Sequence, residues 1–350
     1  MAYTTIDNSG LFFNTVLYTG TGNAHTVTGV GFQPDWLWQK SRSAGQDPRA
    51  FDAVRGGSKL IYPSLNTAES TDSQYITSFN ADGFTMGTAG GNANDNNVTY
   101  VAWNWKANGS GSSNTAGSIN STVSANTTSG FSIVKWSGSA STATVGHGLG
   151  IAPELVFYKG LGTTGWYTYA KHALGSNGAV GKVVVGFLEN TAAFTNDTTS
   201  FQSTDPSSTL LYVAAGANQS MENVAYCFAS VKGFSKMGSY IGNGEPIGDA
   251  PFIYTGFKPA FVLIKSSSYA GQHWAMTDNR RLGYNGDSAW LKADESGAEL
   301  TNLVNPNLLS NGFSVQNNND IYNKNGQTYI YMAFAESPFV TSTGVPTPAG

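Results

Sequence analysis

Short runs in which apolar and polar positions alternate dominate the chain. Trp103 and Trp105 follow this pattern, as do Tyr226 and Phe228. A period of two is typical of a β-strand that buries one face. Helical spacing appears only weakly, near Ala293–Leu303. Because Gly- and Ser-rich turns separate the runs, the pattern predicts an all-β protein of antiparallel β-sandwiches with jelly-roll or concanavalin-like topology.

The same landmarks occur three times along the chain. A Gly-x-x-Pro segment leads into an apolar run that ends in lysine, at Gly31–Lys40, Gly150–Lys159 and Gly256–Lys265. Proline before aromatic and β-branched residues indicates the start of a strand. A later aromatic strand ends at position 105, 228 or 334, which lies 71, 75 and 75 positions after the prolines (105 − 34, 228 − 153 and 334 − 259). This near-constant spacing predicts three related repeats.

Two further landmarks support the repeats. A strand precedes each proline, beginning at Phe13, Phe131 and Met237, and a Phe follows Gly or Ser at Gly83-Phe84, Ser200-Phe201 and Gly312-Phe313. We therefore expect sandwich repeats over residues 1–110, 111–232 and 233–350, the last with an extended tail after Phe339. The small polar residues 107–130 are typical of a linker, in which Ser118–Ser124 alternates and could form an edge strand of the second repeat.

Composition narrows the function classes. Charged residues make up 11% of the 350 residues and the net charge is −4, with Lys and Arg scattered singly. No basic face for nucleic acid is expected, and no apolar run approaches the roughly 18 residues that span a bilayer. The single cysteine, Cys227, excludes an internal disulfide and is expected to be a buried hydrophobe. The first residues lack the pattern of a signal peptide, which fits assembly in a host cytoplasm and release by lysis.

The repeated segments resemble a domain family of tailed-bacteriophage virion proteins, especially those of marine phages. The resemblance covers almost the whole chain, and the matching residues are Gly31–Asp35, Asp52–Gly56, Tyr100–Lys106, Gly146–Glu154, Gly256–Lys265 and Tyr329–Glu336. It implies a virion structural role, often in tail or fibre proteins, and it carries no catalytic residues.

We therefore expect a structural protein at the virion surface, in the tail or in a fibre- or adhesin-type appendage. A rod of sandwiches with pairing strand edges favours a homo-oligomer, with a trimer preferred, that contacts other virion proteins and a host surface glycan. One alternative is a capsid decoration (cement) protein on the head lattice. Another is a carbohydrate-binding module or a polysaccharide depolymerase.

Candidate sites are few, and no enzyme activity is expected. A glycosidase needs two carboxylates, and Asp35, Asp52, Glu69 and Asp72 are the candidates in the first repeat. Asp35 aligns with Glu154 but then with Ala260, so the other repeats do not keep the set.

Asp52 and Arg55 recur as Asp278 and Arg281. Such an acid–base pair either fixes a ligand or pins a turn as a local ion pair, and the second reading is favoured.

Four residues are candidates for sugar or partner contact: Trp166, Tyr167, His273 and Trp274. The alternative for these rings is packing inside the sandwich. The loops Asn92–Asn97 and Gln316–Asp320 carry oxygen ligands that suit Ca²⁺, but the same residues are the usual chemistry of turns. No cofactor is expected, and the histidines at 25, 147, 172 and 273 lie in contexts too different for a shared metal site.

Overall fold

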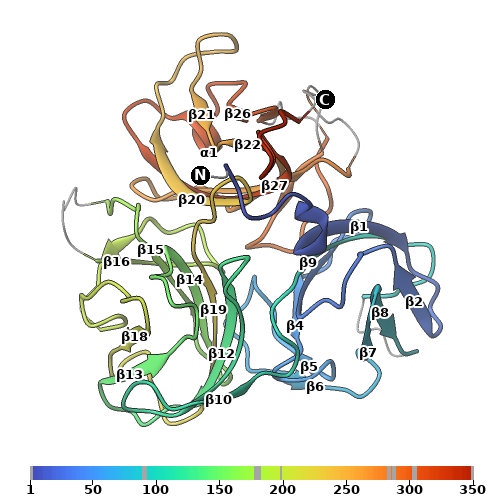
Figure 1. Ribbon diagram of the computed structural model, residues 1–350, viewed down its shortest axis with the longest axis vertical. Helices are drawn as coiled ribbons and strands as arrows, with labels where there is room; N and C mark the ends of the chain where they lie inside the picture. The colour runs from blue at the N-terminus through green and yellow to red at the C-terminus, as the bar shows by residue number, and fades with distance from the viewer. Residues whose placement is uncertain are drawn as a thin grey trace.

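Antiparallel strands form nearly all of the regular structure (Figure 1). The computed structural model describes residues 3–88, 93–176, 183–197, 199–281, 285, 289–301 and 306–347. Across these ranges the only helical elements are a 3-10 turn, η1 (Ser9–Leu11), and one short helix, α1 (Asp320–Asn323). The all-β sandwich expectation is confirmed. The weak helical pattern near Ala293–Leu303 is wrong for its described part, which holds turns and a β-bridge between Trp290 and Leu300.

The chain forms three lobes, each built from a larger and a smaller sheet. The first lobe has a four-stranded sheet in the order β1-β9-β3-β4, a three-stranded sheet β2-β8-β7 and a small pair β5-β6. Its strands are β1 (Phe13–Thr19), β2 (His25–Thr28), β3 (Trp36–Ser41), β4 (Arg49–Asp52), β5 (Lys59–Leu60), β6 (Ser70–Thr71), β7 (Ile76–Asn80), β8 (Gly83–Met86) and β9 (Thr99–Trp105).

The second lobe has an eight-stranded sheet, β10-β11-β12-β19-β14-β15-β16-β17, and a pair β13-β18. Its strands are β10 (Ser112–Asn114), β11 (Ser121–Asn126), β12 (Phe131–Ser137), β13 (Ala143–Gly146), β14 (Leu155–Gly160), β15 (Trp166–Ala170), β16 (Val184–Phe187), β17 (Thr195–Asn196), β18 (Leu210–Val213) and β19 (Glu222–Phe228). The edge strand expected over Ser118–Ser124 is found at Ser121–Asn126 as β11, and it is not an edge strand because β10 takes the edge of the sheet.

The third lobe has a five-stranded sheet, β20-β27-β22-β23-β24, and a three-stranded sheet β21-β26-β25. Its strands are β20 (Ser235–Ile241), β21 (Phe252–Tyr254), β22 (Phe257–Ser266), β23 (Ala275–Asp278), β24 (Leu291–Lys292), β25 (Asn307–Leu309), β26 (Gly312–Ser314) and β27 (Thr328–Pro338). No helix in the described part of the chain is long and apolar enough to cross a membrane.

The order β1-β9-β3-β4 recurs as β12-β19-β14-β15 and as β20-β27-β22-β23. The register recurs as well, because Trp36 pairs with Trp105, Leu155 with Phe228 and Phe261 with Phe334. One landmark differs. Phe84 and Phe313 lie on β8 and β26, whereas Phe201 lies outside any strand and β18 takes the corresponding place beside β13. A common origin of the lobes and the exact domain limits stay predictions.

The central strands of each large sheet are buried on both faces, not on one as their period of two predicted. On β3, Leu37 points into the core of the first lobe, while Trp36 and Trp38 point into a second core. Every residue of β3, β14 and β22 is buried. A strand covered on both sides reads as a nearly continuous apolar run, and this explains segments such as Leu155–Tyr158.

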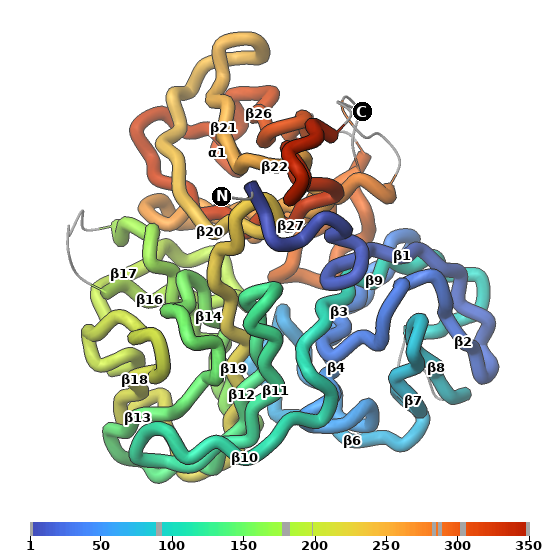
Figure 2. The backbone as a smooth tube through the Cα atoms, viewed as in Figure 1, coloured from blue at the N-terminus to red at the C-terminus, as the bar shows by residue number. Residues whose placement is uncertain are grey.

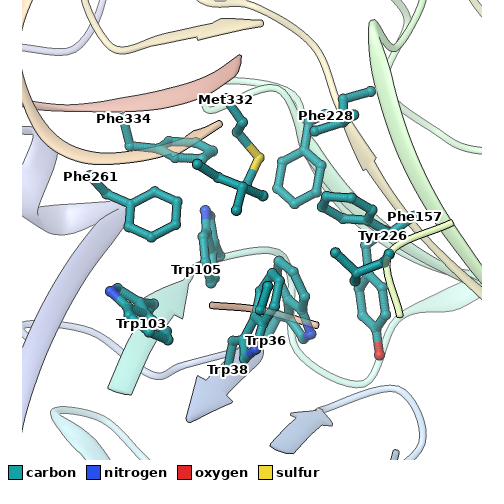
Figure 3. Packing of buried hydrophobic residues seen from close by; sticks show 14 of the residues in the cluster. Trp36, Trp38, Trp103, Trp105, Phe157, Tyr226, Phe228, Phe261, Met332 and Phe334 are labelled. Carbon is teal, nitrogen blue, oxygen red and sulfur yellow. The ribbon is translucent and has the colours of Figure 1, made fainter. Parts of the chain in front are cut away.

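This second core is shared by all three lobes and lies at the centre of the molecule (Figure 3). Trp105, Phe228 and Phe334 occupy equivalent positions and meet in a closed triangle, with ring centroids 6.3, 5.7 and 6.0 Å apart. All three contacts are edge-to-face, the arrangement that aromatic quadrupoles favour. The lobes therefore surround one centre (Figure 2) and do not form the rod expected from the tandem repeats.

Candidate functional site

The acid–base pairs singled out in the sequence lie where lobes meet. Asp52 Oδ2 accepts a hydrogen bond from Arg55 Nε at 2.6 Å, and its Oδ1 accepts from the backbone N–H of Val54 and Arg55. Arg55 also pairs with Glu69 at 2.9 Å. In the third lobe, Asp278 Oδ2 accepts from Arg281 Nε at 2.7 Å. The prediction of a local ion pair that pins a turn is confirmed.

Each of these aspartates also accepts a hydrogen bond from a neighbouring lobe, which the sequence did not indicate. The Tyr226 hydroxyl of the second lobe donates to Asp52 Oδ2 at 2.6 Å. The Trp103 indole N–H of the first lobe donates to Asp278 Oδ2 at 3.0 Å. A buried ion pair is costly to desolvate unless its remaining lone pairs are satisfied. The neighbouring lobe supplies that donor, so lobe packing and the ion pair depend on each other.

The second lobe has neither part of this arrangement. Ala170 pairs with Leu155 as Asp52 pairs with Trp36, and Ala173 stands three positions later, where Arg55 stands in the first lobe. The position equivalent to Tyr226 and Trp103 is Met332, which has no N–H or O–H to donate. The acid–base pair is thus present at the two positions where the facing lobe supplies a donor.

Trp166 and Trp274 anchor one lobe to another and do not present a sugar-stacking surface. Trp166 is fully buried, and its indole N–H donates to the Tyr62 carbonyl of the first lobe at 2.8 Å. Trp274 is 1% exposed and donates to the Phe187 carbonyl of the second lobe at 3.0 Å. Stacking on a sugar needs an exposed ring face, so the role expected for these two residues does not fit their burial. The indole rings of Trp166 and Trp274 both pack in the shared core, which the sequence did not reveal.

Tyr167 and His273 lie apart from those rings. Tyr167 is half-buried, with its ring 5.7 Å from that of Tyr158 and 5.5 Å from that of Phe187. His273 is partly exposed, and its Nδ1 lies 2.9 Å from Asp294 Oδ2. Trp166 and Trp274 therefore belong to two different lobe junctions, and the four candidate residues do not form one site.

The lysine that closes each Gly-x-x-Pro run is fully buried in all three lobes. Lys40 Nζ donates to the carbonyl of Glu295 at 2.6 Å, and Lys159 Nζ to that of Thr164 at 2.5 Å. Lys265 Nζ donates to the Gln272 carbonyl. Burial, only partly offset by nearby carboxylates, lowers the pKa of each lysine to about 8. Sequence reasoning did not single out these lysines as functional groups. The signal that could have done so is a lysine at the end of an apolar strand, because lysine is almost never fully buried without partners.

A groove of about 620 Å³ runs between the second and third lobes. Glu154 and His172 line one bank, and residues of β20 line the other. Burial alone would raise the pKa of Glu154, but hydrogen bonds from His172 and Ser230 and the charge of Lys171 lower it to about 2. The Glu154 carboxylate is therefore charged at neutral pH. Lys232 and Lys236 also line this groove.

The other candidate groups are engaged in local structure. Asp35 accepts from the backbone N–H of Ala107 at 2.7 Å, and Asp72 caps a turn through the N–H of Gln74. The oxygen-rich loops act likewise, since Asn94 accepts from Thr21 N and Asn319 from Ile321 N. Asn92 lies outside the described residues. Among the described side chains, no group of three or more His, Cys, Asp or Glu residues converges on a metal position.

Comparison with known proteins places the chain in a family. A family model described as "Domain of unknown function (DUF7483)" matches residues 8–338. A search of curated proteins and a search of solved structures each found no match. The match runs through all three lobes from η1 to the end of β27. The chain therefore belongs to the DUF7483 family, whose function is unknown.

Proposed function

We propose that the chain is a phage virion structural protein of the tail or of a surface appendage. The observation that carries this proposal is the shared aromatic centre, to which all three lobes contribute. It makes one chain a rigid body with three outward lobes. A rigid chain of this kind is suited to a structural role in a larger assembly. Its buried ion pairs and indole hydrogen bonds hold the lobes together. The sequence resemblance to virion proteins supports the same role.

Capsid decoration is the second candidate function, and the arrangement of the three lobes supports it. Three lobes whose large sheets share one four-strand order stand around one centre. A body of this kind matches a position of threefold symmetry, which both a head lattice and a tail tip offer. Contact with other virion proteins, assembly into a homotrimer and binding of a host surface glycan remain parts of the proposal.

The location of the chain on particles tests both candidates. Gold-labelled antibodies raised against the recombinant chain should mark the tail or an appendage of purified particles in electron micrographs. Label distributed over the head would favour decoration instead. Intact and partly disrupted particles that carry no label, although the chain is present in the infected cell, would contradict a virion role.

A further inference from the structure

Three edge positions of the large sheets are equivalent, and within the described part of the chain a further strand covers one of them. β1, β12 and β20 stand at the same end of the recurring four-strand order. In the second lobe, β11 and β10 continue the sheet past β12. In the first and third lobes the sheet ends at β1 and at β20. The second lobe therefore shows how an added strand pairs with an edge of this kind.

Linker length explains the difference between the second and third lobes. From Trp105 to Phe131, the first residue of β12, there are 26 positions (131 − 105). From Phe228 to Ser235, the first residue of β20, there are 7 (235 − 228). The longer linker supplies β10 and β11, and the shorter one cannot. The edge of β20 therefore lacks the strand that covers β12.

The preceding loop already bonds the outward N–H groups in the first half of β20, and the edge continues past them to Ser239. The N–H groups of Ser235 and Met237 point away from β27, because they donate to the Val231 carbonyl and to Ser230 Oγ. Side chains and N–H groups repeat every two residues along a strand, so the N–H of Ser239 points the same way. Its equivalent in the second lobe, Lys135, pairs with Thr122 of β11. Ser239 is exposed.

The space beside this edge is a groove and not open surface. Met237, Gly238 and Ser239 form its floor, and Glu154 and His172 of the second lobe form the far bank. Its volume is about 620 Å³, against about 210 Å³ for the groove beside β1. A neighbouring strand lies about 4.8 Å away in a sheet, so one extended chain fits along this floor.

The side chains around the edge indicate the chemistry of the occupant. Ile241, at the end of β20, is 66% exposed, and Tyr254 on β21 is 50% exposed. Lys232 lies 4.6 Å from the Tyr3 ring centroid, and Lys236 donates to the Tyr254 carbonyl. Among the described residues neither lysine forms an ion pair, whereas Glu154 on the far bank of the groove already pairs with Lys171 at 3.5 Å. A partner strand with an apolar residue and a carboxylate would complement both features.

We propose that β20 is a docking edge for an extended segment of another polypeptide, which adds as a strand beside Ser239 and the residues that follow it, as Thr122 of β11 pairs with Lys135 of β12. The segment carries alternating apolar and polar residues with a carboxylate facing Lys232 and Lys236. Main-chain hydrogen bonds supply affinity and the alternate side chains supply specificity, as in other cases of strand addition. This interaction surface goes beyond the proposed particle role and holds for a tail or a head location.

Selection of displayed random decapeptides on the full-length chain tests the proposal. Selected peptides should alternate apolar and polar residues, contain Asp or Glu, and slow hydrogen exchange at the Ser239 amide. Ser239→Pro removes that outward N–H, which an edge strand tolerates, and should weaken binding more than tenfold. Ser239→Ala keeps the N–H and should bind as the unchanged chain does, and a melting temperature for each variant confirms folding.

Three results would overturn the proposal. Peptides that bind equally well to Ser239→Pro, or that protect amides elsewhere, would place docking at another surface. Failure of the selection to yield any peptide dependent on the Ser239 amide would show that this edge receives no strand. Self-association of the chain that Ser239→Pro abolishes would identify a second copy, and not another polypeptide, as the occupant.

Discussion

Raising the pH from 7.5 to 9.5 should stabilise the fold, because the three buried lysines then lose their charge. Their pKa falls from 10.5 in water to about 8 in the folded chain. Between these two values the unfolded chain holds more protons than the folded chain, so the free energy of unfolding rises with pH. Integration over this interval gives about 2 kcal/mol for each lysine and about 6 kcal/mol for three.

Two kinds of group oppose this gain. Burial raises the pKa of Cys227 to about 12, so this thiol ionises first in the unfolded chain. That preference costs about 1 kcal/mol at pH 9.5, and the buried tyrosines, whose pKa values are also raised by burial, cost about 1–2 kcal/mol together. A net gain of about 3 kcal/mol remains, which corresponds to a rise in Tm of about 4 °C for a cooperative unit of this length.

Thermal unfolding followed by circular dichroism at pH 7.5, 8.5 and 9.5 measures this rise. Replacing Lys40, Lys159 and Lys265 together by Met keeps the length of each side chain and removes the charge, so Tm should then fall slightly over the same interval. Each single replacement should remove about 2 kcal/mol of stabilisation, which is about two thirds of the net rise. The matched control Lys135→Met, at a partly exposed surface lysine paired with Glu222, should leave the rise intact. A Tm that stays level or falls in the unchanged chain, or a rise that survives in the triple variant, would refute the reasoning.

Three further changes probe the lobe junctions, each measured by urea unfolding. Phe228→Ala opens the aromatic triangle and should lower the free energy of unfolding by about 4 kcal/mol, and a loss below 1 kcal/mol would mean that the triangle carries little stability. Trp274→Phe keeps an aromatic ring, although a smaller one, and removes the N–H that reaches the Phe187 carbonyl, for an expected loss of about 1–3 kcal/mol; an unchanged midpoint would argue against that bond. Asp52→Ala leaves Arg55 buried without its main partner and should cost about 3–5 kcal/mol, whereas the double variant with Arg55→Ala should cost less; equal or greater loss in the double variant would contradict the coupling.

The sequence predicted the local elements well, because their causes are local. Proline followed by an aromatic and β-branched run marks the start of β3 and β14, and the alternation of Trp103 and Trp105 marks β9. In the third lobe the prediction of a strand start is wrong, because Pro259 lies inside β22 at a register shift opposite Ala335. The local ion pair of Asp52 and Arg55 followed from a spacing of three residues across a turn. These features depend on neighbours in the chain, so a single sequence contains the information needed to find them.

The relations between lobes could not be read in the same way. Period two shows that a strand has two different faces, but Trp36 and Leu37 are both apolar and nothing local shows that each faces a separate core. Trp166 and Trp274 looked available for sugar because they lie beside loops in the sequence, yet their N–H groups reach carbonyls of another lobe. The groove beside β20 depends on a short linker and on the second lobe across from it, which only the fold brings together.

Differential scanning calorimetry of the intact chain tests most directly whether the three lobes are one unit built on a shared core. For 350 residues the calorimetric enthalpy of unfolding should be about 245 kcal/mol near 60 °C. The shared core predicts a single transition whose van't Hoff enthalpy equals that value. Three separable transitions, or a van't Hoff enthalpy near one third of the calorimetric one, would show that the lobes unfold independently and would contradict the account.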